Sequence, residues 1–184
     1  MKSLANHFLI AMPSLQDESF AHSVTLICHH DDEGAMGVVI NQPLQLTVAE
    51  LFSDAGLPTE NLQHPARPIW HGGPVRPDHV FALHDASHEW DNTLTIGDEL
   101  RLTTSADFLE ALAGGEKIAN YLLALGYAGW APSQLELEMS ENAWVYAAAD
   151  KQVIFETAVE KRWEAAASLA GIDLSKMSFY SGKA

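Results

Sequence analysis

The sequence predicts an α+β fold: one domain with a mixed, largely antiparallel sheet and about four flanking helices. Short apolar segments, typical of buried strands, follow one another through the first half of the chain, and helical patterns are inserted singly among them. A chain of 184 residues, 47% of them hydrophobic, is long enough to bury a sizeable core. We therefore expect residues 1–184 to form one compact domain, without regular βαβ winding.

Four helices are predicted from capping and stop signals. Thr47 and Glu50 form a capping box ahead of apolar residues spaced for one helix face, and Gly56 stands at the stop position. Thr157 and Glu160 form a second capping box. In order, the predicted helices cover residues 47–55, 105–113, 132–140 and 157–170.

Eight strands are predicted as short apolar runs between polar or glycine-containing segments. In order, they cover residues 8–11, 24–29, 36–40, 69–71, 79–84, 100–103, 118–125 and 143–147. The segment from Gly56 to Pro68 contains three prolines, which predicts a long surface loop.

The charge of the chain is strongly negative, with 25 acidic and 10 basic residues and a formal net charge of −15. Its cations are scattered along the sequence, so the overall field repels nucleic acids and anionic membrane surfaces. We therefore expect no direct nucleic-acid binding and no membrane binding. A single cysteine excludes an intrachain disulfide, and no secretory leader is recognisable, so the expected location is the cytoplasm.

Cys28 and the histidines are the first candidates for chemistry. A thiol assisted by His30 or His84 would act as a nucleophile or as a redox sensor. Cys28 also shares a strand face with apolar residues, and free cysteine is commonly a small buried hydrophobe, so a core role is the alternative. Adjacent His29 and His30 point to opposite faces of a strand, and no metal site or cofactor is predicted.

Two glycine clusters, at residues 71–75 and 126–130, are the most informative stretches of the chain. Glycine is used where the backbone turns or is approached closely, so the clusters predict two specified backbone corners. The amides of the first cluster would form either an anion nest or a tight turn. Tyr127 and Trp130 in the second would line a ligand pocket or pack in a core or interface.

Taken in order, the motifs of the chain resemble those of the AlgH/YqgE family of bacterial proteins. The main strings are NHFLIAMP at 6–13, VTLICHH at 24–30, GAMGVVINQP at 34–43, HGGPV at 71–75, GYAGW at 126–130 and NAW at 142–144. The resemblance extends to about Asp173. The chain departs from the family at His29, where members have Glu, and at Ala131, where Gly is common.

The resemblance implies a compact α+β domain with a coiled, mixed sheet, and it brings no established activity, cofactor or catalytic residue. The family's genetic link to alginate synthesis implies regulation, which the charge of this chain makes indirect. We expect contacts with a protein partner or a small ligand; the alternatives are an enzyme or redox sensor using Cys28, and a scaffold with an aromatic patch. The candidate contact residues are Asn6, Asn41, Pro43, His71, Gly72, Gly73, Gly126, Tyr127, Gly129 and Trp130.

Overall fold

Ten strands and five α-helices make up the part of the chain that the computed structural model describes, residues 2–176. The strands are β1 (His7–Ala11), β2 (Val24–Asp31), β3 (Gly34–Val39), β4 (Pro43–Thr47), β5 (Pro68–His71), β6 (Val75–Asp85), β7 (Thr93–Ile96), β8 (Leu100–Thr103), β9 (Tyr121–Trp130) and β10 (Trp144–Ala148). The helices are α1 (Val48–Asp54), α2 (Ala106–Ala113), α3 (Gln134–Ser140), α4 (Lys151–Phe155) and α5 (Arg162–Leu169), with 3₁₀ turns at Val159–Lys161 and Leu174–Lys176. The predicted α+β class is confirmed; position 1 and residues 177–184 of the expected domain lie outside the described residues.

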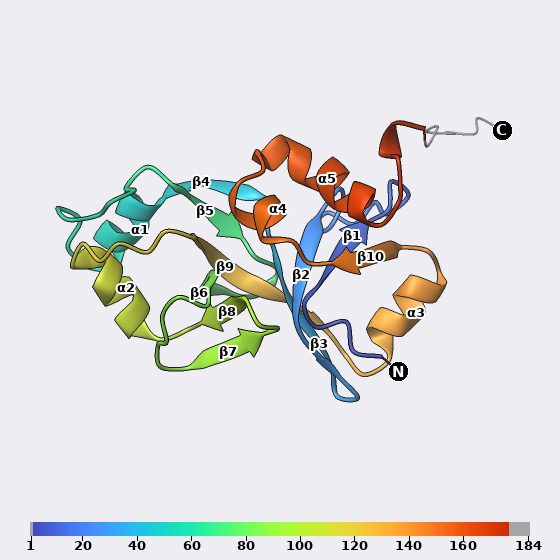
Figure 1. Cartoon of the computed structure of the whole chain (residues 1–184), viewed down its shortest axis with the longest axis horizontal. Coiled ribbons are helices and arrows are strands. Elements are labelled where there is room, and N and C mark those ends of the chain that lie inside the picture. Colours follow the sequence, from blue (N-terminus) through green and yellow to red (C-terminus); the bar gives the residue numbers. More distant parts are fainter. Residues whose placement is uncertain (1, 177–184) are drawn as a thin grey trace.

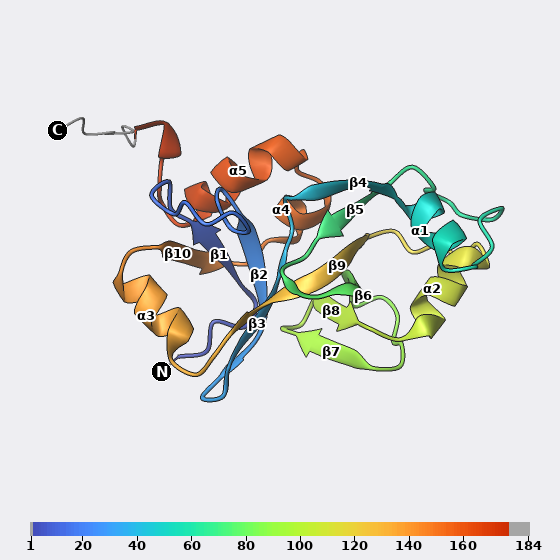
Figure 2. The ribbon, with the colours of Figure 1, turned by 180° about the vertical axis from the view of Figure 1, so that it is seen from behind.

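All ten strands belong to one curled sheet (Figure 1). Strand β9 is shared by two lobes, one containing β1, β2, β3 and β10 and the other containing β4 to β8. The order is β10-β1-β2-β3-β9-β6-β8-β7, and β4 joins through β5, which pairs with β9. Every pairing is antiparallel except that of β5 with β9. The view from behind shows α3 and α5 beside β1, β2 and β10, with α1 and α2 at the opposite end of the molecule (Figure 2).

Three apolar clusters fill the space between the sheet and the helices. The largest lies beneath α4 and α5 and includes the fully buried Phe8, Ile154 and Ala166. A second cluster packs α1 and α2 against the other lobe through Phe52 and Phe108, and a third packs α3 against β1, β2 and β9. Each short helix is therefore held by tertiary packing, which helices of five to eight residues need in water.

The short elements β4, β7 and α4 are not predicted by the sequence. The burial of β4 and β7 is mostly partial, so neither has the continuous apolar run of a strand buried on both faces. Helix α4 spans only five residues, too few for a helical period to stand out. All helices described within residues 2–176 are too short or too polar to cross a membrane.

The two predicted capping boxes have different outcomes. At Thr47 the box is confirmed, because its hydroxyl accepts from the Glu50 amide (3.3 Å) and the Glu50 carboxylate accepts from the Thr47 amide (2.8 Å). The box at Thr157 is wrong, because that hydroxyl donates to the carbonyl oxygen of Gln152, the second residue of α4, at 3.1 Å. Helix α5 consequently begins later, at Arg162.

Candidate functional site

The two glycine clusters meet at a single crossing of the backbone, where the sequence predicted two separate corners. Gly72 and Gly73 follow β5 and pass across β9 at Gly126, which bends that strand with a φ of 74°. A Cβ on Gly72 would lie 2.2 Å from the Gly126 carbonyl oxygen, and one on Gly73 would lie 2.1 Å from the Tyr127 carbonyl carbon. Real Cβ atoms essentially never make contacts this short, so the segment that follows β5 requires glycine at both positions.

The amide of Gly72 donates to the carbonyl oxygen of Leu125 at 2.9 Å, so it is already satisfied by β9. The Gly72 carbonyl oxygen in turn accepts from the amide of Val39. The first cluster therefore joins three strands of the sheet, and its geometry supports a tight backbone packing role over an anion nest.

A hollow of about 380 Å³ opens beside this crossing, between the β2–β3 hairpin and the second half of β9. We call it the hairpin groove and define it by His29, Asp31, Glu33, Met36, Val75 and Tyr127. Gly129 and Trp130 also line it, so three of the predicted contact residues come together here.

The charged side of the hairpin groove is ordered by hydrogen bonds at the hairpin turn. The Asp31 carboxylate accepts from the Glu33 amide (2.8 Å) and contacts Nε2 of His29 (2.8 Å). These contacts hold the pKa of Asp31 below its usual value, with the Glu33 amide making the largest contribution. Among the described residues lining the groove, the fixed charges are Asp31 and Glu33 and no Lys or Arg is present, so the groove is negative at neutral pH.

The two aromatic residues of the second glycine cluster have different roles. Tyr127 is half-buried, with its ring edge-on to Phe81 at 5.5 Å between centroids, and part of it faces the groove. Trp130 is buried, and its indole N–H donates to the Glu138 carboxylate at 2.9 Å, as does that of Trp144 at 2.8 Å. Trp130 therefore holds α3 in place, and Tyr127 is the aromatic residue available to a partner.

Cys28 lies in the largest core cluster and is 2% exposed. Its thiol donates weakly to the carbonyl oxygen of Leu26 at 3.5 Å. Burial raises the pKa of Cys28 to about 12, which disfavours the thiolate that a nucleophile or redox sensor needs. The geometry therefore supports the core role of Cys28 over the reactive one.

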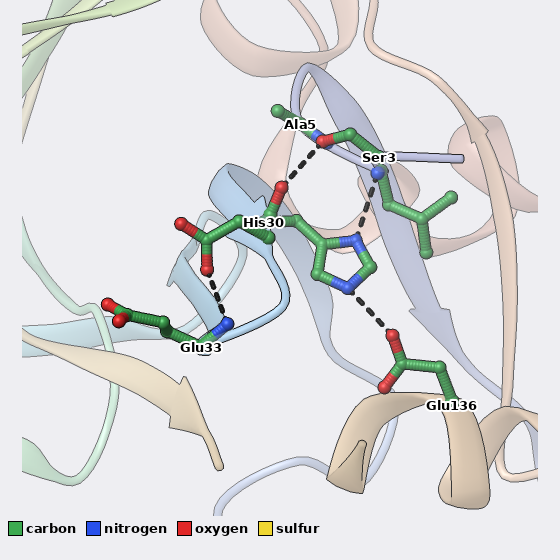
Figure 3. Close-up of polar contacts among 7 residues, drawn as sticks. Ser3, Ala5, His30, Glu33 and Glu136 are labelled. Carbon is green, nitrogen blue, oxygen red and sulfur yellow. Dashed lines mark hydrogen bonds and ion pairs between the residues drawn. The ribbon is translucent and has the colours of Figure 1, made fainter. Parts of the chain in front are cut away.

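His30 joins the start of the chain to α3 (Figure 3). Its Nδ1 accepts from the Leu4 amide at 3.0 Å, and its Nε2 contacts Oε1 of Glu136 at 2.9 Å. Because a backbone N–H can only donate, the neutral imidazole carries its proton on Nε2 and donates it to Glu136. The ring is 4% exposed and both nitrogens are occupied, which makes His30 a structural bridge.

His84 is buried in the other lobe and is equally satisfied. Its Nδ1 donates to the Asp85 carbonyl oxygen (2.7 Å), its Nε2 accepts from the Thr103 hydroxyl (2.8 Å), and its ring stacks on Phe108 at 5.0 Å. Burial lowers the pKa of His84 and keeps the ring neutral. Neither nitrogen is left to assist a thiol.

Four further predicted contact residues lie outside the hairpin groove. The Asn41 side chain accepts from the Val24 amide (2.8 Å) and donates to the His22 carbonyl oxygen (2.9 Å), so it fixes the start of β2. The other three are Asn6, Pro43 and His71. The sequence did not single out Asp31 and Glu33, although their acidic run next to a glycine is a typical hairpin turn signal.

Within residues 2–176, no group of three or more His, Cys, Asp or Glu side chains is arranged to hold a metal ion. His30 and His84 instead contact a carboxylate, a hydroxyl or backbone groups. What the arrangement provides is a negatively charged surface hollow formed by a hairpin turn and a bent strand.

Comparison with known proteins gives matches over nearly the full chain. The family model described as AlgH-like matches residues 8–175. A UPF0301 protein of Stenotrophomonas maltophilia is 49% identical over 180 residues, which cover 98% of this chain and 96% of that protein. A UPF0301 protein of Xanthomonas campestris is 47% identical over 181 residues, with the same coverage of 98% and 96%.

Two solved structures share the fold. The solution structure of the AlgH protein from Pseudomonas aeruginosa has a TM-score of 0.79 at 42% identity, with all of both chains covered. The crystal structure of DIP2367 from Corynebacterium diphtheriae has a TM-score of 0.71 at 22% identity, covering 90% of this chain and 86% of that one, and supports the fold alone. The chain therefore belongs to the AlgH-like family that its motifs predicted.

Proposed function

We propose that this chain is a cytoplasmic regulatory protein that binds a protein partner through the hairpin groove and influences transcription indirectly. One observation carries the proposal: the groove combines the partly exposed side chain of Tyr127 with the carboxylates of Asp31 and Glu33. Its complement is a basic segment that carries an apolar side chain, since charge complementarity steers and orients a partner.

The state of the candidate catalytic residues favours binding over catalysis. Cys28 is in the core with a raised pKa, and the ring nitrogens of His30 and His84 are used to hold the fold. A nucleophile and base must lie within reach of each other and of a substrate. The Cys28 thiol is instead buried in the core, His30 connects β2 to α3, and His84 is hydrogen-bonded to Thr103 of β8. The redox-sensor alternative therefore has no support from their geometry.

The direct test replaces Glu33 with a photo-crosslinking amino acid in the full-length chain, expressed in its native host, with Glu60 as the matched control. Glu60 lies exposed in the loop before β5 and outside the groove. We expect a protein with an exposed basic segment to crosslink at position 33 and not at position 60.

The captured partner must then bind the purified chain with matching specificity. Glu33→Lys should weaken binding at least about tenfold, because it reverses a charge at the groove, and Glu60→Lys should leave the affinity within about twofold. Equal crosslinking at both positions, or equal effects of the two lysine variants, would contradict the proposal.

A further inference from the structure

A second site lies at the junction of the two lobes, away from the hairpin groove. An open cavity of about 220 Å³ is lined by β5 and β9 on one side and by α4 and the first residue of α5 on the other. We call it the arginine pocket and define it by Arg67, Trp70, Asn120, Tyr121, Ile154 and Arg162. Two of the chain's ten cations therefore line one small cavity.

Arg162 is buried, with 7% of its surface exposed, and has no carboxylate partner within residues 2–176. Its Nε donates to the Thr157 carbonyl oxygen at 3.0 Å, Nη1 donates to that of Ile40, and the guanidinium lies 4.5 Å from the centre of the Trp70 ring. Burial lowers the pKa of Arg162 to about 10, so the group is still charged at neutral pH. A buried charge without an opposite charge is costly, and buried charges in proteins are normally paired.

Arg67 approaches the same pocket from the end of the long loop before β5. Its guanidinium lies 4.5 Å from the centre of the Tyr121 ring, and it forms no ion pair with the carboxylates described in residues 2–176. This is unexpected in a chain with 25 acidic residues, where a cation readily finds a surface carboxylate. The two arginines thus line one cavity, and neither forms an ion pair with a carboxylate described in residues 2–176.

The walls of the pocket complete its chemistry. Trp70 and Tyr121 present aromatic rings, Ile154 is apolar, and no described Asp or Glu lines the cavity. The carboxylate of Asp85 contacts one lining residue, Asn120, whose Nδ2 donates to it at 2.9 Å. The same carboxylate accepts from the Ser87 hydroxyl. The Asp85 carboxylate therefore pairs with Asn120 and Ser87, and it does not neutralise the charge of Arg67 or Arg162.

We propose that the arginine pocket binds a small organic anion, with its carboxylate or phosphoryl group on the guanidinium groups of Arg162 and Arg67 and its flat body against Trp70 and Tyr121. The planar guanidinium fork fits both kinds of anion. The cavity of about 220 Å³ is smaller than the roughly 300–1,000 Å³ of sites for drug-sized ligands, so its ligand must be small. The site is separate from the hairpin groove and does not depend on the partner proposed there.

The test titrates the full-length chain with benzoate and with phenyl phosphate, using neutral benzamide as the shape-matched control. Calorimetry should show saturable binding of one or both anions and none of benzamide, and NMR should show a shift of the Arg162 Nε–H signal. Binding of benzoate alone assigns a carboxylate ligand, and binding of phenyl phosphate alone assigns a phosphoryl ligand. No saturable binding of either up to about 10 mM, or equal binding of benzamide, overturns the proposal.

Variants locate the binding. Arg67→Gln should lower the affinity for the anion about tenfold or more, because it removes charge-assisted hydrogen bonds. Arg101→Gln removes the same charge from β8 and should change the affinity less than about twofold. Arg67 is the better target because Arg162 also bonds backbone carbonyls and its loss affects folding. Equal affinities of the two variants would overturn the assignment.

Discussion

Gly72 shows how a single methyl group is excluded at the crossing of β5 and β9. Its φ is not in the left-handed region, so only the 2.2 Å approach of a Cβ to the Gly126 carbonyl oxygen requires glycine there. Gly126 itself has a positive φ, and a Cβ added to it would lie 2.3 Å from the Gly73 carbonyl oxygen. Close approach of two backbones therefore explains Gly72, Gly73 and Gly126, whereas a Cβ on Gly129 would meet nothing closer than 3.4 Å.

Gly72→Ala should lower the free energy of unfolding by about 4 kcal/mol, because two backbone segments would have to separate. Gly114→Ala is the matched control: its Cβ would meet nothing closer than 3.4 Å, and Ala there should be neutral or slightly stabilising. Urea unfolding of the two variants measures the difference. Equal stabilities would contradict the close-packing explanation.

Cys28 should resist iodoacetamide in the native protein and react at once in denaturant, because the thiol is in the core. Its folded pKa of about 12 exceeds the ordinary value of 9.0, so the unfolded thiol loses its proton first. The buried, protonated thiol therefore contributes to the free energy of unfolding in full below pH 9, and this contribution is lost as the pH rises toward 12.

The pH dependence is measured by urea unfolding at several pH values in this window, with Cys28→Ala as the control. The decline in the free energy of unfolding that the thiol causes above pH 9 should be absent in the Cys28→Ala variant. Rapid native alkylation with a low apparent pKa would instead make Cys28 an accessible, activated thiol and restore the redox-sensor alternative.

At the scale of elements, the seven-residue helix α3 is held in place by hydrogen bonds that its carboxylates accept from the neighbouring strands. Glu138 accepts the indole N–H groups of Trp130 and Trp144 on one oxygen and the Gln134 amide on the other. Glu136 accepts from His30. A short helix is thereby attached to β2, β9 and β10 by its polar side chains.

Glu138→Gln should cost about 1–3 kcal/mol of stability, because the neutral amide keeps one acceptor oxygen and its NH2 group then opposes either the Gln134 amide or the two indole N–H groups. Glu141→Gln makes the same change at an exposed position just after α3 and should cost less than about 0.5 kcal/mol. Thermal and urea unfolding compare the two variants. A similar small effect for both would show that the shared carboxylate does not hold α3.

Elements with local signals were predictable, and elements that depend on distant partners were not. The capping box at Thr47 identifies α1 because its hydrogen bonds lie within four residues. The similar pattern at Thr157 fails because its hydroxyl closes α4, an element the sequence does not reveal. Strand β9 was expected to end at Leu125, yet it continues through Gly126 because β3 and β6 pair with both sides of the bend.

At the scale of the whole molecule, the candidate sites could be predicted only in part. Tyr127, Gly129 and Trp130 were recognisable as a cluster, but Asp31 and Glu33 join them only through pairing of the β2–β3 hairpin with β9. Arg67 and Arg162 are 95 residues apart in sequence and appear as scattered surface cations until the two lobes meet. Such sites are properties of the topology, which no local pattern encodes.

The net charge of −15 gives a prediction for the isolated molecule. Purified chain should not bind duplex DNA at near-physiological salt, because its strongly negative net charge repels the phosphates. Fluorescence anisotropy with labelled duplexes of varied sequence measures this. Specific binding at such salt would overturn the indirect mode of regulation.

The most direct measurement of the central claim is transcript profiling of a deletion strain of the native host that carries either Glu33→Lys or Glu60→Lys at the natural expression level. Both variants add the same positive charge to an exposed position, and only Glu33 lies in the hairpin groove. We predict that Glu60→Lys restores the wild-type profile and that Glu33→Lys leaves the deletion profile. Equal restoration by both variants would contradict regulation through this groove.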